Sequence, residues 1–347
     1  MRAVVYEAYG QRPSMQTVPA PRCPPGGVVV AVRATGVCRS DWHAWQGHDP
    51  VRLPAVPGHE FAGVVAEVAD DVRTVRVGDR VTAPFVCGCG VCEWCRRGDA
   101  QVCPDQYQPG FTGPGSFADL VVVPAADLNI VRLPDSVGFT AAAALGCRFA
   151  TAFRAVHAHG RLQAGQWLAV FGCGGVGLSA VLLAQAVGAR VVAVDVSPAA
   201  LERAASLGAE VTADGTDLAA AVRRVIEVTD GGAHVGIDAI GSPLVAAASV
   251  TALRRRGRHV QVGLLLGDTA TTALPMDLVI AKELEVYGSH GMAAVDYPPM
   301  LALIQSGFLD PQRLIGRVVG LDAAGAALAS MGESGPPGLT VVALPDP

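Results

Sequence analysis

A glycine-rich segment in the middle of the chain constrains the possible folds more than any other feature. The apolar run Trp167–Phe171 leads directly into Gly-Cys-Gly-Gly-Val-Gly at 172–177, and a helical pattern continues to about Val187. A strand, a G-x-G-x-x-G turn and a helix in this order form the context that the dinucleotide-binding fingerprint requires. Further apolar strands are expected at Arg190–Val194, Val235–Ile240, His259–Leu264 and Leu284–Tyr287, with helical segments between them. This alternation predicts an α/β fold with a doubly wound parallel sheet, a Rossmann domain, over residues 151–291.

The positions of the glycine turn indicate how it would hold a dinucleotide. Gly172 allows the tight turn, Gly174 lets the backbone approach the pyrophosphate, and Gly177 lets the helix and the strand pack closely. Gly175 and Val176 stand at the start of the helix, whose free N–H groups and partial positive charge favour phosphate. The alternative is a purely structural glycine turn.

The cofactor preference depends on Asp195, which closes the next expected strand. A carboxylate at this position accepts hydrogen bonds from the adenosine ribose hydroxyls and repels a 2′-phosphate. Residues 196–198 are Val, Ser and Pro and offer no arginine to hold such a phosphate. We therefore predict NAD rather than NADP as the cofactor.

The remainder of the chain differs in character from this central part. Residues 1–150 read as short strands separated by Gly, Pro and Asp turn signals, with few long helical patterns. The character changes again after about Gly291, and we expect the tail to pack back on the first domain. The sequence therefore predicts a second domain made of residues 1–150 and 292–347.

Within this second domain, a cysteine cluster at about residues 86–105 is the most specific signal in the sequence. Cys89, Cys92, Cys95 and Cys103 follow the spacing C-x2-C-x2-C-x7-C. Four thiolates satisfy tetrahedral zinc completely, so this lobe would hold a structural ion with no open position. Free structural cysteines and an iron–sulfur cluster are the alternatives. Cys87 would be a fifth cysteine in a site that needs four, and we interpret it as a residue that does not bind the metal.

Three separate elements could form a second, open metal site. They are Cys38, His59 in the tripeptide Gly-His-Glu that ends at Glu60, and Cys147. Two thiolates and one imidazole leave a fourth position for water or substrate, as in catalytic zinc sites. Each residue alone also has an ordinary explanation, because a buried cysteine usually packs and a buried histidine is usually hydrogen-bonded.

The whole chain resembles the zinc-containing medium-chain dehydrogenase/reductase family. Its alcohol dehydrogenases carry G-x-C-R/H-S/T-D followed by H, then G-H-E, a four-cysteine lobe and G-x-G-x-x-G, and all of these stand here in the same order. The resemblance implies a β-rich, GroES-like catalytic domain beside the Rossmann domain. It also implies that Cys38, His59 and Cys147 bind a catalytic zinc, that Glu60 can approach this metal, and that the lobe binds a second zinc. The implied reaction is the reversible, NAD-linked oxidation of a primary or secondary alcohol to an aldehyde or ketone.

The segment after Cys38 supplies the residues expected to move protons and hold the cofactor. The Ser40 hydroxyl can take the proton from the substrate alcohol, and the resemblance extends this relay through the nicotinamide ribose to His43. Asp41 is expected to accept the free N–H of His59 and so fix its tautomer. Arg39 is expected to contact the cofactor pyrophosphate. Each has an ordinary surface or turn role as its alternative.

Aromatic residues are the candidates for the substrate pocket. Phe85, four residues before Cys89, matches a pocket-wall position in the family. Trp45 and Phe111 are further candidates, although either could equally belong to the core.

Charge and composition limit the possible partners. A net charge of −5 without a basic tract argues against nucleic acid, and no apolar run has the length of a membrane span. An odd number of cysteines, nine, without an export signal argues against a disulfide framework and predicts a cytoplasmic protein. The family resemblance implies a small alcohol or carbonyl substrate and association with copies of the same chain. The family resemblance favours a tetramer, with a dimer possible.

Three alternatives to an alcohol dehydrogenase remain open on the sequence. A polyol or threonine dehydrogenase of the same family is one, although Cys147 argues against polyol enzymes, which commonly use a carboxylate as third ligand. A metal-free quinone or enoyl reductase is the second, and Cys38, His59 and Asp195 argue against it. The third is a zinc- and nucleotide-binding scaffold without activity, which would not require Ser40 and His43.

Overall fold

The computed structural model of the chain describes residues 1–332 and 338–345 and divides into two compact units. Of the described residues, the first unit contains Met1–Ala150 together with 291–332 and 339–345. The second unit is centred on Thr151–His290. Each unit has its own sheet and its own hydrophobic core.

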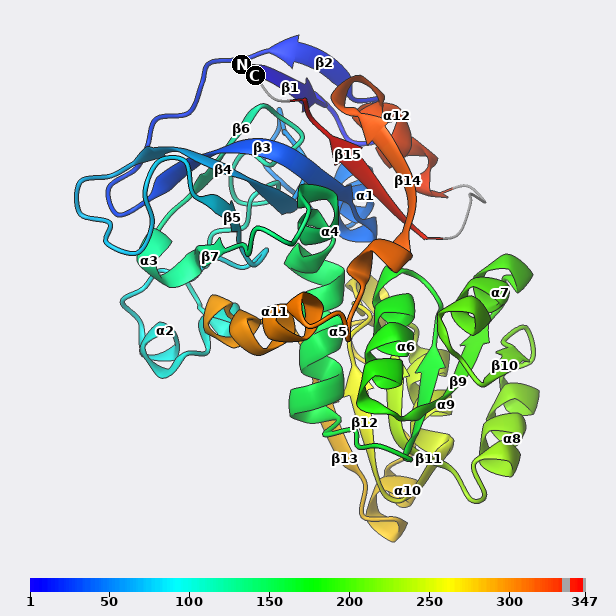
Figure 1. Ribbon diagram of the computed structural model, residues 1–347. Coiled ribbons are helices and arrows are strands. Elements are labelled where there is room, and N and C mark those ends of the chain that lie inside the picture. Colours follow the sequence, from blue (N-terminus) through cyan, green and yellow to red (C-terminus); the bar gives the residue numbers. More distant parts are fainter. Residues whose placement is uncertain (333–337, 346–347) are drawn as a thin grey trace. The chain divides into compact units, whose positions relative to one another are not determined.

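The first unit is built on a mostly antiparallel sheet with the strand order β14-β15-β3-β4-β5-β7, to which β6 adds by pairing with β3 (Figure 1). Its strands are β3 (Val28–Val37), β4 (Glu60–Val68), β5 (Arg80–Thr82), β6 (Leu120–Val123), β7 (Val131–Arg132), β14 (Ile315–Gly320) and β15 (Leu339–Ala343). A separate antiparallel pair is formed by β1 (Arg2–Val5) and β2 (Ser14–Thr17). The tail does return to this unit, because β15 pairs antiparallel with β3.

Short helices fill the connections of the first unit. They are α1 (Arg39–Gln46), α2 (Glu93–Arg97), α3 (Ala126–Asn129), α4 (Phe139–Ala143), α11 (Tyr297–Gln305) and α12 (Ala324–Ala329). Single 3-10 turns are η1 (Ala100–Val102), η5 (Ala294–Asp296), η6 (Pro311–Leu314), η7 (Leu321–Ala323) and η8 (Ser330–Gly332). A π-helical turn, η2 (Leu145–Phe149), follows α4. Isolated π turns of this kind are frequent at functional sites.

The second unit contains a parallel sheet with the strand order β10-β9-β8-β11-β12-β13. Its strands are β8 (Trp167–Phe171), β9 (Arg190–Asp195), β10 (Val211–Asp214), β11 (Ala233–Asp238), β12 (Leu253–Gln261) and β13 (Glu285–Gly288). Every pairing in this sheet is parallel. The order reverses between β8 and β11, and such a switch point is where open α/β sheets bind ligands. The predicted α/β class with a doubly wound sheet is confirmed.

Helices connect these strands. They are α6 (Gly175–Val187), α7 (Pro198–Leu207), α8 (Leu218–Val228), α9 (Pro243–Thr251) and α10 (Met276–Ala281), with a 3-10 turn η4 (Gly267–Thr269). The helix α5 (Ala150–Arg154) and the π turn η3 (Ala155–His159) precede β8. The start of α7 illustrates the local signals. Ser197 accepts a hydrogen bond from the Ala200 N–H at 3.4 Å, and Pro198 occupies the first turn, where its missing N–H costs nothing.

Two strands of the second unit differ from expectation. β10 was not predicted, because it is a short, half-exposed edge strand without a continuous apolar run. β12 begins at Leu253, before the expected start at His259, because its first half is rich in arginine and hides the strand pattern. Its pairing with β11 is also interrupted by a register shift between Ala233 and Val235.

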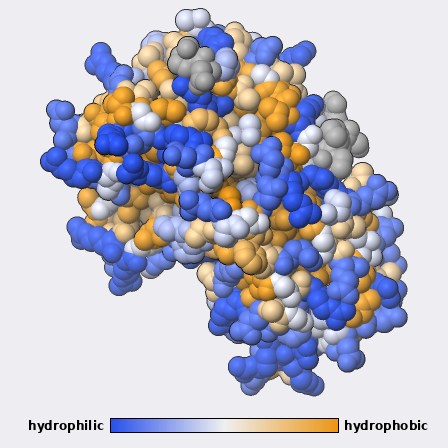
Figure 2. Space-filling view, in the orientation of Figure 1, coloured by the Kyte–Doolittle hydropathy of each residue, from blue (hydrophilic) through white to orange (hydrophobic). Residues whose placement is uncertain are grey.

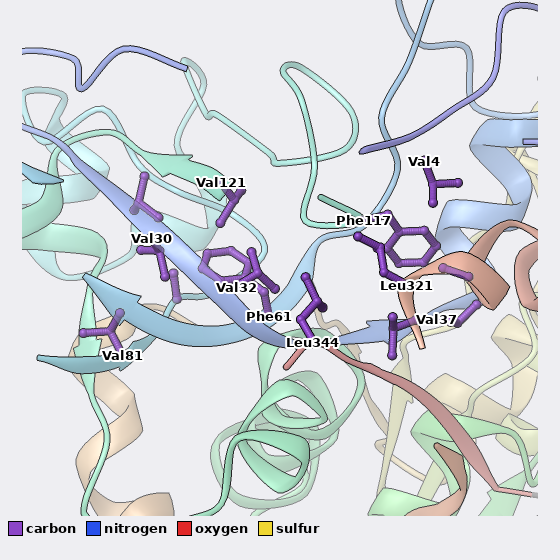
Figure 3. Packing of buried hydrophobic residues seen from close by; sticks show 14 of the residues in the cluster. Val4, Val30, Val32, Val37, Phe61, Val81, Phe117, Val121, Leu321 and Leu344 are labelled. Carbon is purple, nitrogen blue, oxygen red and sulfur yellow. The ribbon is translucent and has the colours of Figure 1, made fainter. Parts of the chain in front are cut away.

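The core of the first unit lies between its sheet and the surrounding segments. β3 contributes Val30 and Val32, β4 contributes Phe61, and the loop before β6 contributes Phe117, all of them buried (Figure 3). Leu321 joins this cluster from the C-terminal tail. The core therefore fixes the ends of β3 and β4, where the candidate metal ligands are found.

The surface carries both polar and apolar side chains. On the face drawn in Figure 2, hydrophilic residues predominate and hydrophobic ones appear in separate areas. In the part of the chain that the structure describes, no helix is long and apolar enough to cross a membrane.

Candidate metal centres and dinucleotide-binding turn

Three segments of the first unit bring four potential metal ligands together. Cys38 follows β3, His59 precedes β4, Glu60 begins β4, and Cys147 lies in the π turn η2. β3 and β4 pair with Gly36 opposite Glu60, so the register brings Cys38 and His59 to the same end of the two strands. One possible ligand atom from each of the four residues lies within 4.8 Å of the others. The residues selected from the sequence therefore converge at one point.

Asp41 orients two of these ligands. Its Oδ1 lies 2.8 Å from His59 Nδ1 and also accepts the Gly58 N–H at 3.0 Å. Its Oδ2 accepts the backbone N–H of Cys38 at 3.2 Å. With Nδ1 engaged, His59 presents Nε2 to the cluster, and this buried atom has no hydrogen-bond partner among the described residues. An unpartnered buried ring nitrogen costs free energy unless a ligand such as a metal ion occupies it.

Arg148 holds Glu60 from the other side of the cluster. The backbone N–H and Nε of Arg148 both donate to Glu60 Oε1 at 3.0 Å, and Nη2 donates to Oε2. Glu60 is fully buried and Arg148 nearly so. Gly36 is required beside them, because a Cβ at this position would lie 2.2 Å from Glu60 Oε2. Both oxygens of Glu60 are therefore occupied by a buried ion pair.

The charges around the cluster shift the pKa values of its ligands. A hydrogen bond from Cys147 lowers the pKa of Cys38 well below its ordinary value, against the effect of burial and with the help of the Arg148 charge. The same hydrogen bond raises the pKa of Cys147 well above its ordinary value. Burial lowers the pKa of His59, but the charges of Asp41 and Cys38 outweigh it and raise that pKa. The site thus favours a thiolate at Cys38, which is the form that binds metal.

The four-cysteine lobe forms a second cluster. The sulfur atoms of Cys89, Cys92, Cys95 and Cys103 lie within 4.8 Å of one another. Two backbone N–H groups donate to these sulfur atoms. The N–H of Cys89 donates to the Cys103 sulfur at 3.3 Å, and the N–H of Cys95 donates to the Cys92 sulfur at 3.4 Å. Hydrogen bonds from the backbone of residues 91 and 92 lower the pKa of Cys89 to about 7. The lobe is therefore a closed set of four sulfur atoms.

Asn129 anchors the start of this lobe. Its Oδ1 accepts the Gly88 N–H at 2.9 Å, and its Nδ2 donates to the Gly88 carbonyl at 2.9 Å. Gly88 itself must lack a side chain, since a Cβ would lie 2.6 Å from the sulfur of Cys95. Cys87 lies outside the cluster, and burial raises its pKa to about 12. Cys87 is thus a buried thiol.

The glycine turn of the second unit has the geometry of a tight strand-to-helix connection. Gly172 has a φ of +97°, which disfavours any side chain. A Cβ at Gly177 would lie 1.8 Å from the Gly172 carbonyl oxygen, whereas a Cβ at Gly174 would meet nothing within 4 Å. The turn therefore packs closely at Gly177 and leaves open space at Gly174. Gly175 and Val176 form the first turn of α6.

Asp195 is held rigidly beside this turn. Its Oδ2 accepts the Cys173 N–H at 2.6 Å, and its Oδ1 accepts the Ser197 N–H at 2.8 Å. It is the last residue of β9, and β9 pairs directly with β8. These contacts bring the carboxylate to the carboxyl end of the sheet, next to the glycine turn.

The expected relay and cofactor residues lie on α1. The Oγ of Ser40 is 3.9 Å from the sulfur of Cys38. His43 is half-buried one turn further along the helix. Arg39 is exposed, and its guanidinium lies 5.0 Å from the centroid of the Trp42 ring.

Two of the three expected pocket residues stand beside His59. The rings of Phe85 and Phe111 meet the His59 ring edge-on, with centroid distances of 5.9 Å and 5.3 Å. Trp45 does not join them. It belongs to the hydrophobic core of the first unit, and its indole N–H donates to the Gln11 carbonyl at 2.5 Å. Of the two roles left open for Trp45, pocket wall or core, its contacts support the core, and its candidacy for the pocket is corrected accordingly.

Comparison with known proteins assigns the family. An alcohol dehydrogenase GroES-like domain matches residues 24–135, and a zinc-binding dehydrogenase domain matches residues 175–306. An alcohol dehydrogenase of Geobacillus stearothermophilus is 32% identical over 292 residues, which cover 83% of this chain and 84% of that protein. The chain belongs to the zinc-dependent medium-chain alcohol dehydrogenases.

Solved structures of this alcohol dehydrogenase family agree. An alcohol dehydrogenase from Thermus sp. ATN1 superimposes with a TM-score of 0.91 at 31% identity, covering 99% of both chains. A putative zinc-binding dehydrogenase from Sinorhizobium meliloti, bound to NADP, gives a TM-score of 0.87 at 27% identity over 99% of both chains. The resemblance stated from the motifs is confirmed, as is zinc-dependent alcohol oxidoreduction as the function. The alternatives of a metal-free quinone or enoyl reductase and of an inactive scaffold are not favoured.

Two residues that build the sites of this alcohol dehydrogenase were not predicted. Arg148 directly follows a proposed ligand, and a charged residue there within an otherwise apolar helical stretch was the available signal. Asn129 gave no signal, because its contact with Gly88 spans 41 positions. Both act through contacts that no local motif describes.

Proposed function

We propose that this alcohol dehydrogenase is NAD-linked, holds two zinc ions per chain, and interconverts a primary or secondary alcohol and its aldehyde or ketone. The observation that carries the proposal is the convergence of Cys38, His59 and Cys147, with a buried Nε2 on His59 that lacks a partner among the described residues. Two sulfur atoms and one imidazole suit zinc and leave one coordination position open. The donor set therefore fits a catalytic zinc.

The residues around this site have separate proposed tasks. Bound there, zinc would supply Lewis-acid chemistry to the substrate oxygen, and a nicotinamide would accept the hydride. Asp41 keeps Nε2 of His59 available by engaging Nδ1. Arg148 occupies both oxygens of Glu60, which supports a resting ligand set without Glu60. The positive charge of Arg148 also offsets part of the negative charge of the thiolates.

Ser40 and His43 are assigned to proton transfer. Ser40 follows the ligand Cys38 by two positions, and its Oγ lies near the ligand sulfur. Its hydroxyl can accept the proton of the substrate alcohol while donating its own toward His43. His43 is half-buried and can exchange a proton at neutral pH. Arg39 is exposed on the same helix and is proposed to bind the cofactor pyrophosphate.

The choice of NAD rests on Asp195. The backbone N–H groups of Cys173 and Ser197 hold its carboxylate in place, so it cannot easily swing away from a 2′-phosphate. Gly174 leaves the open space through which the backbone of 172–177 can approach a pyrophosphate. The similar dehydrogenase from Sinorhizobium meliloti was solved with NADP, so the preference of this chain for NAD over NADP has to be measured directly.

The lobe sulfurs of residues 89, 92, 95 and 103 are assigned to a structural zinc, since a closed set of four thiolates offers no position to substrate. Phe85 and Phe111 are assigned to the walls of the substrate pocket because both flank His59. The sequence further favours a cytoplasmic homo-oligomer, with a tetramer preferred over a dimer.

The experiment that tests the function is a turnover assay on metal-replete protein. We expect primary or secondary alcohols to be oxidised with NAD, with a higher kcat/KM than with NADP. Purified protein that contains zinc but turns over no alcohol with either cofactor would contradict the proposal.

A further inference from the structure

Two histidines at the end of α1 pack against each other. The Nδ1 atoms of His43 and His48 lie 3.1 Å apart, and their ring centroids are separated by 5.3 Å. This distance is that of a hydrogen bond in which one ring donates and the other accepts. Nothing in the motifs that identify the family assigned a role to His48.

The end of the helix creates this contact. Gly47 ends α1 with a φ of +79°, a left-handed conformation that glycine adopts without strain. The turn brings the N–H of His48 onto the carbonyl of His43 at 2.9 Å. The backbone therefore folds His48 back over His43, so the ring contact does not depend on a flexible surface side chain.

The two rings differ in their access to water. His43 is half-buried, whereas His48 is exposed. Trp42 covers both, with ring centroids 5.1 Å from His43 and 5.5 Å from His48. The contact with His48 occupies Nδ1 of His43, which leaves Nε2 for the proton relay. Within the pair, His43 thus offers Nε2 to the relay, and His48 is the ring that reaches solvent.

The charged groups near His43 lie on α1, at the residue before it and in the loop after it. Burial, followed by the charges of His48 and Arg39, lowers the pKa of His43, while Cys38 and Asp49 act in the opposite direction. A neutral His43 can accept a proton, and it returns that proton more readily when a second acceptor is in contact.

We propose that His48 is the residue through which His43 exchanges protons with solvent during alcohol oxidation. This inference rests on the proposed function, because it extends the relay from Ser40 to His43. His43 takes up one proton at Nε2 and releases the proton on Nδ1 to Nδ1 of His48. His48 then releases its Nε2 proton to water, which leaves His43 protonated at Nε2 and His48 protonated at Nδ1. Before the next turnover His48 takes up a proton from water at Nε2 and returns its Nδ1 proton to Nδ1 of His43, and His43 releases its Nε2 proton to water. His48 touches neither substrate nor cofactor, and it acts through His43.

The test compares His48→Gln with Asp49→Asn in holoenzyme. Asp49→Asn removes a charge from the same loop and keeps both rings, so it is the matched control. Single-turnover alcohol oxidation with NAD is measured across pH in dilute buffer and again with increasing imidazole. We expect His48→Gln to be slower by about tenfold in dilute buffer, less than the ~10²-fold or more associated with a direct acid–base group.

Rescue separates proton exchange from a structural role. Added imidazole should restore the rate of His48→Gln while the KM for the alcohol stays unchanged. The rate of Asp49→Asn should not respond to imidazole, and its pH profile should shift only slightly, because loss of the Asp49 charge lowers the pKa of His43. A second readout is the NMR titration of His43 in the absence of substrate, where loss of His48 should raise the pKa of His43 because a neighbouring charge is removed.

The outcomes are distinct. A His48→Gln protein that matches wild type in dilute buffer, or that is slow and does not respond to imidazole, overturns the inference. A wild-type protein with no alcohol turnover overturns the proposed function, and the inference with it.

Discussion

The buried ion pair between Glu60 and Arg148 leads to a quantitative prediction. Glu60 is fully buried, and the side chain of Arg148 donates two of the three hydrogen bonds that Glu60 receives from it. Arg148→Met keeps most of the volume but removes the positive charge and these two donors. Breaking a buried pair by removing one partner costs about 3–5 kcal/mol, because the remaining charge is left uncompensated.

The assay is urea unfolding of zinc-loaded protein, followed by tryptophan fluorescence, to which Trp42, Trp45 and Trp94 contribute from the first unit and Trp167 from the second. With a denaturant slope of ~2–3 kcal/mol per molar urea, the expected loss moves the midpoint down by roughly 1–2.5 M. The double variant Glu60→Met with Arg148→Met removes both charges, and it should lose less stability than Arg148→Met alone.

A midpoint for Arg148→Met within about 0.3 M of wild type, less than ~1 kcal/mol at such slopes, would refute the reasoning. The same is true if the double variant is no more stable than Arg148→Met, because the cost would then not come from an unpaired Glu60.

Three further predictions follow from individual contacts. Asp195→Gly should weaken NAD binding and reduce discrimination against NADP, measured as the ratio of the two kcat/KM values; an unchanged ratio would contradict the assignment. Cys92→Ser should lower the zinc content by one ion per chain and the unfolding midpoint with it, whereas Cys87→Ala should leave the zinc content unchanged by elemental analysis. Gly36→Ala should destabilise the first unit by about 1–3 kcal/mol in urea unfolding, because its Cβ would meet Glu60 Oε2 at 2.2 Å; wild-type stability would show that the site relaxes without cost.

Motifs predicted the parts of the molecule in which chemistry is tied to local spacing. The glycine turn was recognisable because its glycines are required by local geometry within six residues. Gly172 has a positive φ, and Gly177 packs closely against the Gly172 carbonyl. The four cysteines of the lobe were recognisable for the same reason, since short loops alone bring their sulfurs together.

Residues that act across long distances in the chain were harder to predict. The site of Cys38, His59 and Cys147 was only a weak hypothesis from spacing, and the family resemblance was needed to support it. Arg148 meets Glu60 across 88 positions, through a π turn that no propensity rule anticipates. The sequence left Trp45 equally open to the pocket and the core, because it does not tell which face of a short helix is buried, and the structure places it in the core.

Elemental analysis of zinc in Cys38→Ala tests the central claim most directly, with wild-type protein measured alongside. Three ligands hold the proposed catalytic ion, and removal of one thiolate from an open site should release it, while the closed four-sulfur lobe keeps its own. We predict two zinc ions per chain in wild type and one in Cys38→Ala, with alcohol turnover lost. Two zinc ions in the variant, or retained turnover, would contradict a catalytic metal at Cys38.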